Sequence, residues 1–261
     1  MNESELIEYY NKFNEDKRLK TRHGRIEFIT TLKYIEEILK NYKNPAILDV
    51  GAGTGAYSIY LADKGYDVTA VELVKHNLRV IEKNSNKVKV LQGNAINLNK
   101  IPDGSMDIVL LFGPMYHLIS EDEKIKALNE AKRVLKRDGT ILIQYIMNEY
   151  AVITHAFKEK EILSSLKDKK LDQNYHIISS ANDLYSYVRL EDIDNFNKKA
   201  DLKRIKIVSP DTIANYFREY VNKLNDEEFN EFIKYHLSIC ERSDILGLCG
   251  HILDIVKKSL D

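Results

Sequence analysis

Apolar residues along the chain fall into two patterns, short continuous runs and longer stretches with helical spacing. The short runs have the length of buried strands, and they cover residues 46–50, 67–71, 88–91, 106–112 and 140–145. The stretches between them place apolar side chains three or four residues apart, notably over 57–64, over 75–84 and after Ser120. Strands that alternate with helices predict an α/β fold, a doubly wound, Rossmann-like and mainly parallel sheet with helices on both faces.

Turn and capping residues give the predicted boundaries. Asn44-Pro45 ends the first helical region, because proline cannot continue a helix. Gly65 suits the left-handed position just after the helix at 57–64. Ser120 and Glu123 form a capping box, and Asp138-Gly139 is predicted to end the helix that begins there.

The segments outside this core are less regular. Residues 1–43 are predicted as an N-terminal helical cap and residues 44–147 as the cofactor-binding core. Further predicted elements are helices at 151–170, 191–199 and 211–237 and strands at 184–189, 204–208 and 248–256. We expect one domain with a seven-stranded sheet, in which 148–183 and 211–246 are lid insertions and 248–261 holds the closing strand.

Composition narrows the classes of partner. The chain has 39 Lys and Arg against 40 Asp and Glu, so no overall field attracts nucleic acid or an anionic membrane, and we expect neither as a partner. No apolar run approaches the roughly 18 residues of a membrane span. Cys240 and Cys249 lack CxxC spacing and the polar N-terminus lacks a leader, which predicts a cytoplasmic protein. We expect a monomer or homodimer with a small-molecule substrate.

A glycine-rich loop, Gly51-Ala52-Gly53-Thr54-Gly55, lies between the first predicted strand and the next helix. Glycine permits a tight turn and close backbone approach, and the free amides of a helix start bind polar ligand groups. Glu72 ends the second strand about twenty residues later, where a carboxylate accepts hydrogen bonds from a ribose diol. Together they predict a nucleotide-like cofactor, against the plainer interpretation of a tight turn and a solvated strand end.

The sequence of the loop alone does not distinguish between two possible cofactors. Gly51, Gly53 and Ala56 also satisfy the G-x-G-x-x-G/A pattern of nicotinamide dinucleotide binding. An NAD(P)-dependent oxidoreductase is therefore an alternative, although the catalytic Tyr-x-x-x-Lys pattern is missing near the fifth strand. A non-catalytic regulatory module that keeps the cofactor pocket is a second alternative.

A resemblance to a known family favours one of the two cofactors and leaves the non-catalytic module open. Residues 47–55, Ile-Leu-Asp-Val-Gly-Ala-Gly-Thr-Gly, resemble motif I of class I S-adenosylmethionine-dependent methyltransferases, in which an acid at the position of Asp49 precedes the first glycine. Residues 105–111 are similar to the family's fourth strand. Residues 130–139 resemble its E-x-x-R-V-L-K-P-G-G segment, with Arg137-Asp138 in place of Pro-Gly.

Two further segments resemble one subgroup of that family. Gly113-Pro114-Met115-Tyr116-His117-Leu118 is similar to its G-P-L-Y-H-L segment, and residues 250–256 are similar to its A-H-L-L-A-V-A strand. The resemblance implies methyl transfer from S-adenosylmethionine to an oxygen or nitrogen of a small molecule. It implies a cofactor site formed by Asp49, Gly51, Ala52, Gly53, Gly55, Glu72, Leu73, Asn94, Ala95 and Phe112, with Arg25 and Tyr10 from the N-terminal region.

Some of these residues have specific expected roles. Asn94 stands where an acid often contacts the adenine amino group, and its amide oxygen is able to accept the same bond. Arg25 is a candidate partner for the methionyl carboxylate and Tyr10 for folding over the pocket, against a simple surface placement of both.

The loop after the fourth strand carries the candidate catalytic residues. His117 is the candidate general base, because the unperturbed pKa of histidine lies near neutrality, with a backbone-bonding, capping role as the equal alternative. Tyr116 is a candidate for a cation–π contact with the sulfonium or for a substrate bond, against plain packing. His251 is interpreted as a sheet residue. No acids or histidines have metal-ligand spacing, so we predict no metal, and the absent Asn/Asp-Pro-Pro-aromatic motif argues against methylation of nucleic-acid bases.

Overall fold

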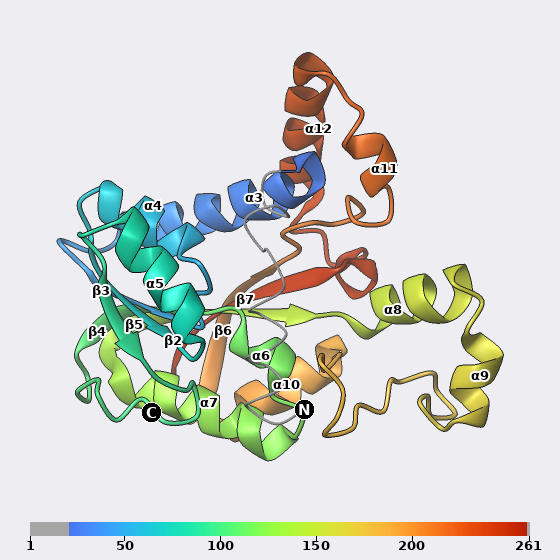
Figure 1. The fold of residues 1–261 in the computed structure, drawn as a ribbon, viewed down its shortest axis with the longest axis horizontal. Helices are drawn as coiled ribbons and strands as arrows, with labels where there is room; N and C mark the ends of the chain where they lie inside the picture. The colour runs from blue at the N-terminus through green and yellow to red at the C-terminus, as the bar shows by residue number, and fades with distance from the viewer. Residues whose placement is uncertain (1–20, 260–261) are drawn as a thin grey trace.

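Seven strands form a single sheet in the computed structural model, which describes residues 21–259 (Figure 1). The strands are β1 (Ala46–Val50), β2 (Asp67–Glu72), β3 (Lys89–Gln92), β4 (Met106–Leu111), β5 (Leu135–Ile146), β6 (Leu202–Val208) and β7 (His251–Lys258). Their order is β3-β2-β1-β4-β5-β7-β6; the first five are parallel, and β7 runs antiparallel to both β5 and β6. The predicted Rossmann-like, mainly parallel seven-stranded sheet is confirmed.

Helices cover both faces of the sheet (Figure 1). One layer consists of α3 (Arg22–Leu39), α4 (Ala56–Asp63) and α5 (Lys75–Asn84), and the other of α6 (Pro114–His117), α7 (Glu121–Val134) and α10 (Leu190–Lys199). Successive strand residues point to opposite faces, so Ile108 and Leu110 pack in the first layer while Val109 and Leu111 pack in the second. Burial on both faces explains why the strands appear in the sequence as continuous apolar runs.

The helix that begins at Ser120 ends earlier than predicted. Its capping box with Glu123 is present, but α7 stops at Val134 and β5 already begins at Leu135, which pairs with Met106. Gly139 does not end a helix. A β-carbon there would lie 2.8 Å from the backbone oxygen of Asp107, so this glycine permits close approach of two strands.

The predicted helix at 151–170 is three shorter pieces, α8 (Asn148–Ala151), the π-helix η1 (Val152–Lys158) and α9 (Ile162–Lys167). Thr154 donates from its hydroxyl to the backbone oxygen of Tyr150 at 2.6 Å, which competes with the helical ladder, and Lys160 takes a left-handed φ of 62°. The second predicted insertion helix is likewise divided, into α11 (Arg218–Val221) and α12 (Asp226–Ile239). These two insertions extend from the body of the sheet in different directions (Figure 1).

Two predicted strands differ from the structure. Residues 184–189 form no strand, because their backbone amides bond to different elements. The amide of Ser186 donates to the carbonyl of Tyr116, and that of Val188 donates to the carbonyl of Ile146. The closing strand begins at His251 rather than at residue 248, after the 3₁₀ turn η2 (Leu246–Leu248). Within residues 21–259, no helix combines the length and apolar character needed to cross a membrane.

Candidate functional site

The glycine loop turns sharply from β1 into α4 at the carboxyl edge of the sheet. Gly51 donates from its amide to the carbonyl of Val71 at 2.8 Å, which holds the loop against the end of β2. Gly51, Gly53 and Gly55 all have positive φ, of 73°, 55° and 90°. These conformations are strained for residues with a β-carbon, so the turn needs its glycines.

Gly53 is the position where the loop opens outward. A β-carbon on Gly53 would meet nothing within 4 Å, whereas one on Gly51 would lie 2.4 Å from Pro114 Cδ and one on Gly55 would lie 2.8 Å from Ile81 Cγ1. Gly51 and Gly55 are therefore required for packing inside the protein. The space beside Gly53 is where a ligand is able to approach the backbone.

Glu72 lies directly under this opening. Its carboxylate accepts hydrogen bonds from the amides of Gly53 at 2.8 Å and Val74 at 2.9 Å. The side chain is buried, and burial raises the pKa of its carboxyl group. A direct hydrogen bond therefore joins the glycine loop to the acid at the end of β2.

Asp49 supplies a second buried carboxylate beneath the loop. The hydroxyl of Ser58, in the first turns of α4, donates to Asp49 Oδ2 at 2.5 Å. The pKa of Asp49 is raised to about 6, chiefly by burial and in smaller part by the charge of Glu72. A cationic group bound near the loop would relieve the repulsion between these carboxylates, which suits a ligand that carries a sulfonium or an ammonium group.

The other predicted cofactor residues line the same edge of the sheet. The amide of Gly93 donates to the carbonyl of Glu72, which joins the loop after β3 to the end of β2. In that loop Asn94 accepts a bond from the amide of Ile96 at 3.2 Å through its side-chain oxygen, and Ala95 is buried. Leu73 is partly buried after β2. Phe112 is buried after β4, with its ring 5.1 Å from that of Tyr57.

The two N-terminal candidates are placed differently. Tyr10 lies outside the described residues. Arg25 is exposed on α3, and its guanidinium lies 5.5 Å from the centre of the Phe229 ring in α12. The structure therefore shows Arg25 packed against the second insertion.

Tyr116 is held by a chain of hydrogen bonds that the sequence analysis missed. Its hydroxyl donates to Gln144 Oε1 at 2.7 Å, and Gln144 Nε2 donates to the hydroxyl of Thr31 at 3.0 Å. This chain joins α6, β5 and α3. The only local signal was a polar residue, Gln144, inside the apolar run of β5.

His117 is bound to the backbone. Its Nδ1 atom lies 2.9 Å from the carbonyl oxygen of Leu184, and since a carbonyl only accepts, Nδ1 carries the proton. The pKa of His117 is lowered to about 4, chiefly by burial and in smaller part by the nearby charge of Lys124. This geometry matches the backbone-bonding alternative for His117 better than the role of a base at neutral pH.

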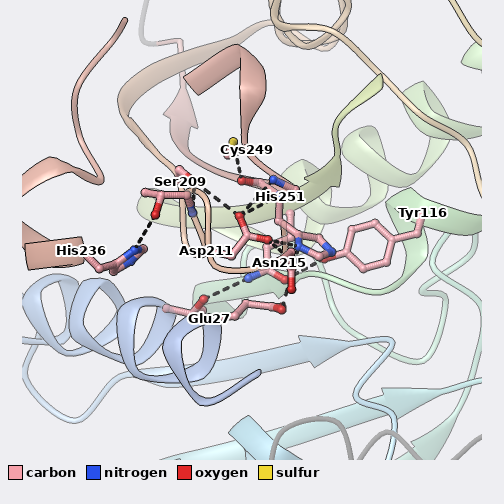
Figure 2. Close-up of polar contacts among 12 residues, drawn as sticks. Glu27, Tyr116, Ser209, Asp211, Asn215, His236, Cys249 and His251 are labelled. Carbon is pink, nitrogen blue, oxygen red and sulfur yellow. Dashed lines mark hydrogen bonds and ion pairs between the residues drawn. The ribbon is translucent and has the colours of Figure 1, made fainter. Parts of the chain in front are cut away.

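A second polar cluster lies beside Tyr116, and the sequence analysis did not assemble it (Figure 2). His251 Nδ1 lies 2.6 Å from Asp211 Oδ2 and 3.9 Å from Glu27 Oε2, and its ring centre is 5.8 Å from that of Tyr116. Asp211 and Glu27 are both buried. Glu27 is an acid on the apolar side of α3, which is a detectable signal, but its pairing with residues about 200 positions away follows only from the fold.

No group of three or more His, Cys, Asp or Glu side chains that would suit a metal ion occurs among residues 21–259. The carboxylates described above bond to backbone amides, hydroxyl groups or histidine, and their arrangement suits an organic ligand.

Comparison with known proteins agrees with this geometry. Residues 48–143 match the family model of a methyltransferase domain. A glycine/sarcosine N-methyltransferase of Parasynechococcus marenigrum is 31% identical over 113 residues, which are 41% of this chain and 40% of that enzyme. A ubiquinone biosynthesis O-methyltransferase of Rickettsia prowazekii is 28% identical over 176 residues, covering 58% of this chain and 67% of that one. The chain thus spans less than half the length of the first of these relatives.

Solved structures show the same fold. An S-adenosylmethionine-dependent methyltransferase from Leishmania major superimposes with a TM-score of 0.63 and 11% identity, covering 98% of this chain and 82% of the other. The domain match includes the glycine loop, Glu72 and β4, and it implies S-adenosylmethionine as the cofactor.

Proposed function

We propose that the protein transfers a methyl group from S-adenosylmethionine to an oxygen or nitrogen nucleophile of a small molecule. The observation that carries this proposal is the contact between the cofactor loop and α6: Gly51 packs against Pro114, and Tyr116 follows in the same short helix. The loop that would hold the cofactor and the segment that would face the acceptor are therefore in direct contact.

In the proposed cofactor site, Glu72 binds the ribose diol and the loop amides at Gly51, Ala52, Gly53 and Gly55 lie along the methionyl and ribose parts. The buried charge of Asp49 favours the cationic cofactor from below the loop. Asn94 would accept from the adenine amino group, with Leu73, Ala95 and Phe112 as apolar walls. Arg25 and Tyr10 stay candidates for closing the site from the N-terminal side.

Methyl transfer requires that the nucleophile be held in line with the methyl group in a site that excludes water. Tyr116 is anchored through Gln144, so its ring is fixed on the acceptor side. We assign His117 to positioning, because its bond to Leu184 fixes the segment that follows α6. The two insertions, α8 to α9 and α11 to α12, are the proposed lids.

The acceptor is proposed by class only. The two relatives described above methylate, by their names, the nitrogen of glycine or sarcosine and an oxygen in ubiquinone biosynthesis. The near-zero net charge favours a small molecule over nucleic acid. An NAD(P)-dependent oxidoreductase is the less favoured function, because Asp49 precedes the glycines as in methyltransferases and the domain match covers the same loop.

A direct assay tests the proposal. Purified protein is incubated with methyl-tritiated S-adenosylmethionine and a panel of small amines and hydroxy compounds, and labelled product and S-adenosylhomocysteine are measured. We expect both to form in equal amounts, and only with an acceptor present. Cofactor binding without turnover on any acceptor would instead favour the non-catalytic regulatory module.

A further inference from the structure

His251 stands at the edge of the sheet where ligands bind. It is the first residue of β7 and pairs with Ile146 near the end of β5. Because β7 is antiparallel, its start lies at the carboxyl edge of the parallel strands, the edge that carries the glycine loop. The rings of His251 and Tyr116 are side by side there (Figure 2).

Asp211 fixes the orientation of the His251 ring. The Asp211 carboxylate has no solvent exposure, and its Oδ1 atom accepts bonds from the amides of Gly250 at 3.2 Å and His251 at 3.1 Å. Its Oδ2 atom accepts from Asn215 Nδ2 and lies 2.6 Å from His251 Nδ1. A carboxylate only accepts, so Nδ1 of the neutral ring carries the proton and the basic nitrogen is Nε2.

The charges around this ring favour a cation. Glu27 brings a second buried carboxylate to within 3.9 Å of Nδ1, so two acids flank one imidazole. Even with the ring protonated, the three groups together carry net negative charge when both acids are ionised. A protonated amine would compensate that charge, whereas a neutral hydroxyl group would not.

We propose that Asp211 and His251 form a proton-accepting pair for an amine methyl acceptor that binds beside Tyr116; this inference rests on the proposed function. The acceptor ammonium gives one proton to Nε2 of His251, which leaves a lone pair on nitrogen. That lone pair forms the bond to the methyl carbon while the carbon–sulfur bond of the cofactor breaks and its electron pair stays on sulfur. The imidazolium then releases its proton to solvent. Asp211 is a positioning residue, because it acts through the ring.

The other two histidines near this cluster, His117 and His236, are less suited to accept a proton from the acceptor. His117 donates to a carbonyl rather than to a carboxylate, and it lies near the cation of Lys124. His236 is fully buried and bridges the hydroxyls of Thr30 and Thr212 at 2.8 and 3.0 Å. His251 combines a carboxylate on one nitrogen with a position beside Tyr116.

Kinetics of a His251→Gln variant test the pair. We expect kcat to fall about 100-fold or more, the usual range for loss of a general base, while the Kd for S-adenosylmethionine changes less than about threefold. The acidic limb of the wild-type pH profile of kcat/KM should disappear. The groups placed near the ring are Asp211, Glu27 and Tyr116. Asp211→Asn should keep the acidic limb and move it to lower pH, because the ring loses a carboxylate that stabilises its protonated form. Lys203→Gln, which changes an exposed residue of β6 outside the proposed site and lids, should change neither quantity.

A spectroscopic measurement tests whether Asp211 orients the His251 ring, even without an acceptor. Nitrogen chemical shifts of the histidine rings, assigned with His251→Gln, should show the Nδ1-protonated tautomer for His251 in the wild type at a pH where the ring is neutral. A ring protonated on Nε2 instead overturns the inference. So does a correctly folded His251→Gln variant that keeps wild-type kcat and its acidic limb. A wild type that binds S-adenosylmethionine yet methylates nothing would refute the proposed function and with it the catalytic role of the pair, while the tautomer would still report whether Asp211 orients the ring.

A comparison of two acceptors tests the preference for an amine. Two acceptors that differ only in an amine against a hydroxyl group are compared in the wild type and in Glu27→Gln. We expect the amine to be preferred at least tenfold and the preference to shrink in the variant. Preference for the hydroxyl compound would overturn the assignment of an amine.

Discussion

Pro114 packs so closely on Gly51 that a β-carbon on the glycine would lie 2.4 Å from Cδ of the proline ring. The contact joins the turn after β1 to the first residue of α6, two segments separated by more than sixty residues in the chain. It packs the cofactor loop directly against the segment that carries Tyr116. The first glycine of motif I and the proline after β4 are both explained by this one interface.

Gly51→Ala should therefore destabilise the fold. The alanine would be strained at a φ of 73° and would overlap Pro114, and the two effects together cost roughly 2–4 kcal/mol. Urea denaturation measures this loss. Gly53→Ala is the matched comparison, since it has the strain but no clash, and it should lose about 1 kcal/mol. Equal losses in the two variants would contradict the packing account.

Gly53→Val should mainly affect cofactor binding. The valine side chain would enter the open space beside the loop, where the methionyl and ribose parts of the cofactor are expected to lie. We expect the Kd for S-adenosylmethionine to rise tenfold or more by isothermal titration. Gly104→Val is the control, because Gly104 has a similar φ of 58° and open surroundings but lies in the turn before β4. An unchanged Kd for Gly53→Val would remove this loop from the site.

Asp49→Asn should change stability and binding in opposite directions. The pKa of Asp49 is raised to about 6 in the folded protein, so its charge costs stability above that pH and the cost is relieved as the pH falls. The variant lacks this charge, and we expect the ligand-free form to be more stable at pH 7.5, by urea denaturation. Its affinity for the cationic cofactor should fall. In the wild type, affinity should weaken as the pH drops through 6. A variant that gains stability and keeps full affinity would show that the charge has no role in binding.

His236 should make the protein sensitive to mild acid. Burial lowers its pKa from 6.5 to about 4, so the folded state holds the ring neutral while the unfolded state binds a proton. Stability from this group is complete above pH 6.5 and is lost as the pH falls toward 4. The loss is on the order of 3 kcal/mol. Urea denaturation between pH 7.5 and 4.5 measures it, and His236→Gln should show a shallower decline, since glutamine does not titrate. Parallel curves for both proteins would contradict this account.

The strands and the cofactor loop were predictable because their signals are local. A continuous apolar run such as 106–112, or glycines between a strand and a helix, fixes a backbone conformation from neighbouring residues. Gly139 was misinterpreted as a helix end because its role depends on the carbonyl of Asp107 across the sheet, which its neighbours in the sequence do not reveal. Residues 184–189 have a strand-like composition, yet their amides bond to α6 and the end of β5 instead of a neighbouring strand.

The acceptor side was less predictable for the same reason. Glu27, Asp211 and His251 come from the two ends of the chain, and each alone matches an ordinary helix, loop or strand residue. The fold brings them together because β7 lies next to β5 and α3 packs across both strands. The spacing of these residues in the sequence does not predict such contacts. The glycine loop and Glu72, in contrast, belong to one short and regular strand-helix-strand unit, so their proximity is predictable.

Isothermal titration of the ligand-free protein with S-adenosylmethionine and, separately, with NAD tests the central claim most directly. The account predicts saturable binding of S-adenosylmethionine at one site per chain and no measurable heat with NAD. Binding of NAD without binding of S-adenosylmethionine would contradict it and would restore the oxidoreductase alternative for the loop at Gly51 to Gly55.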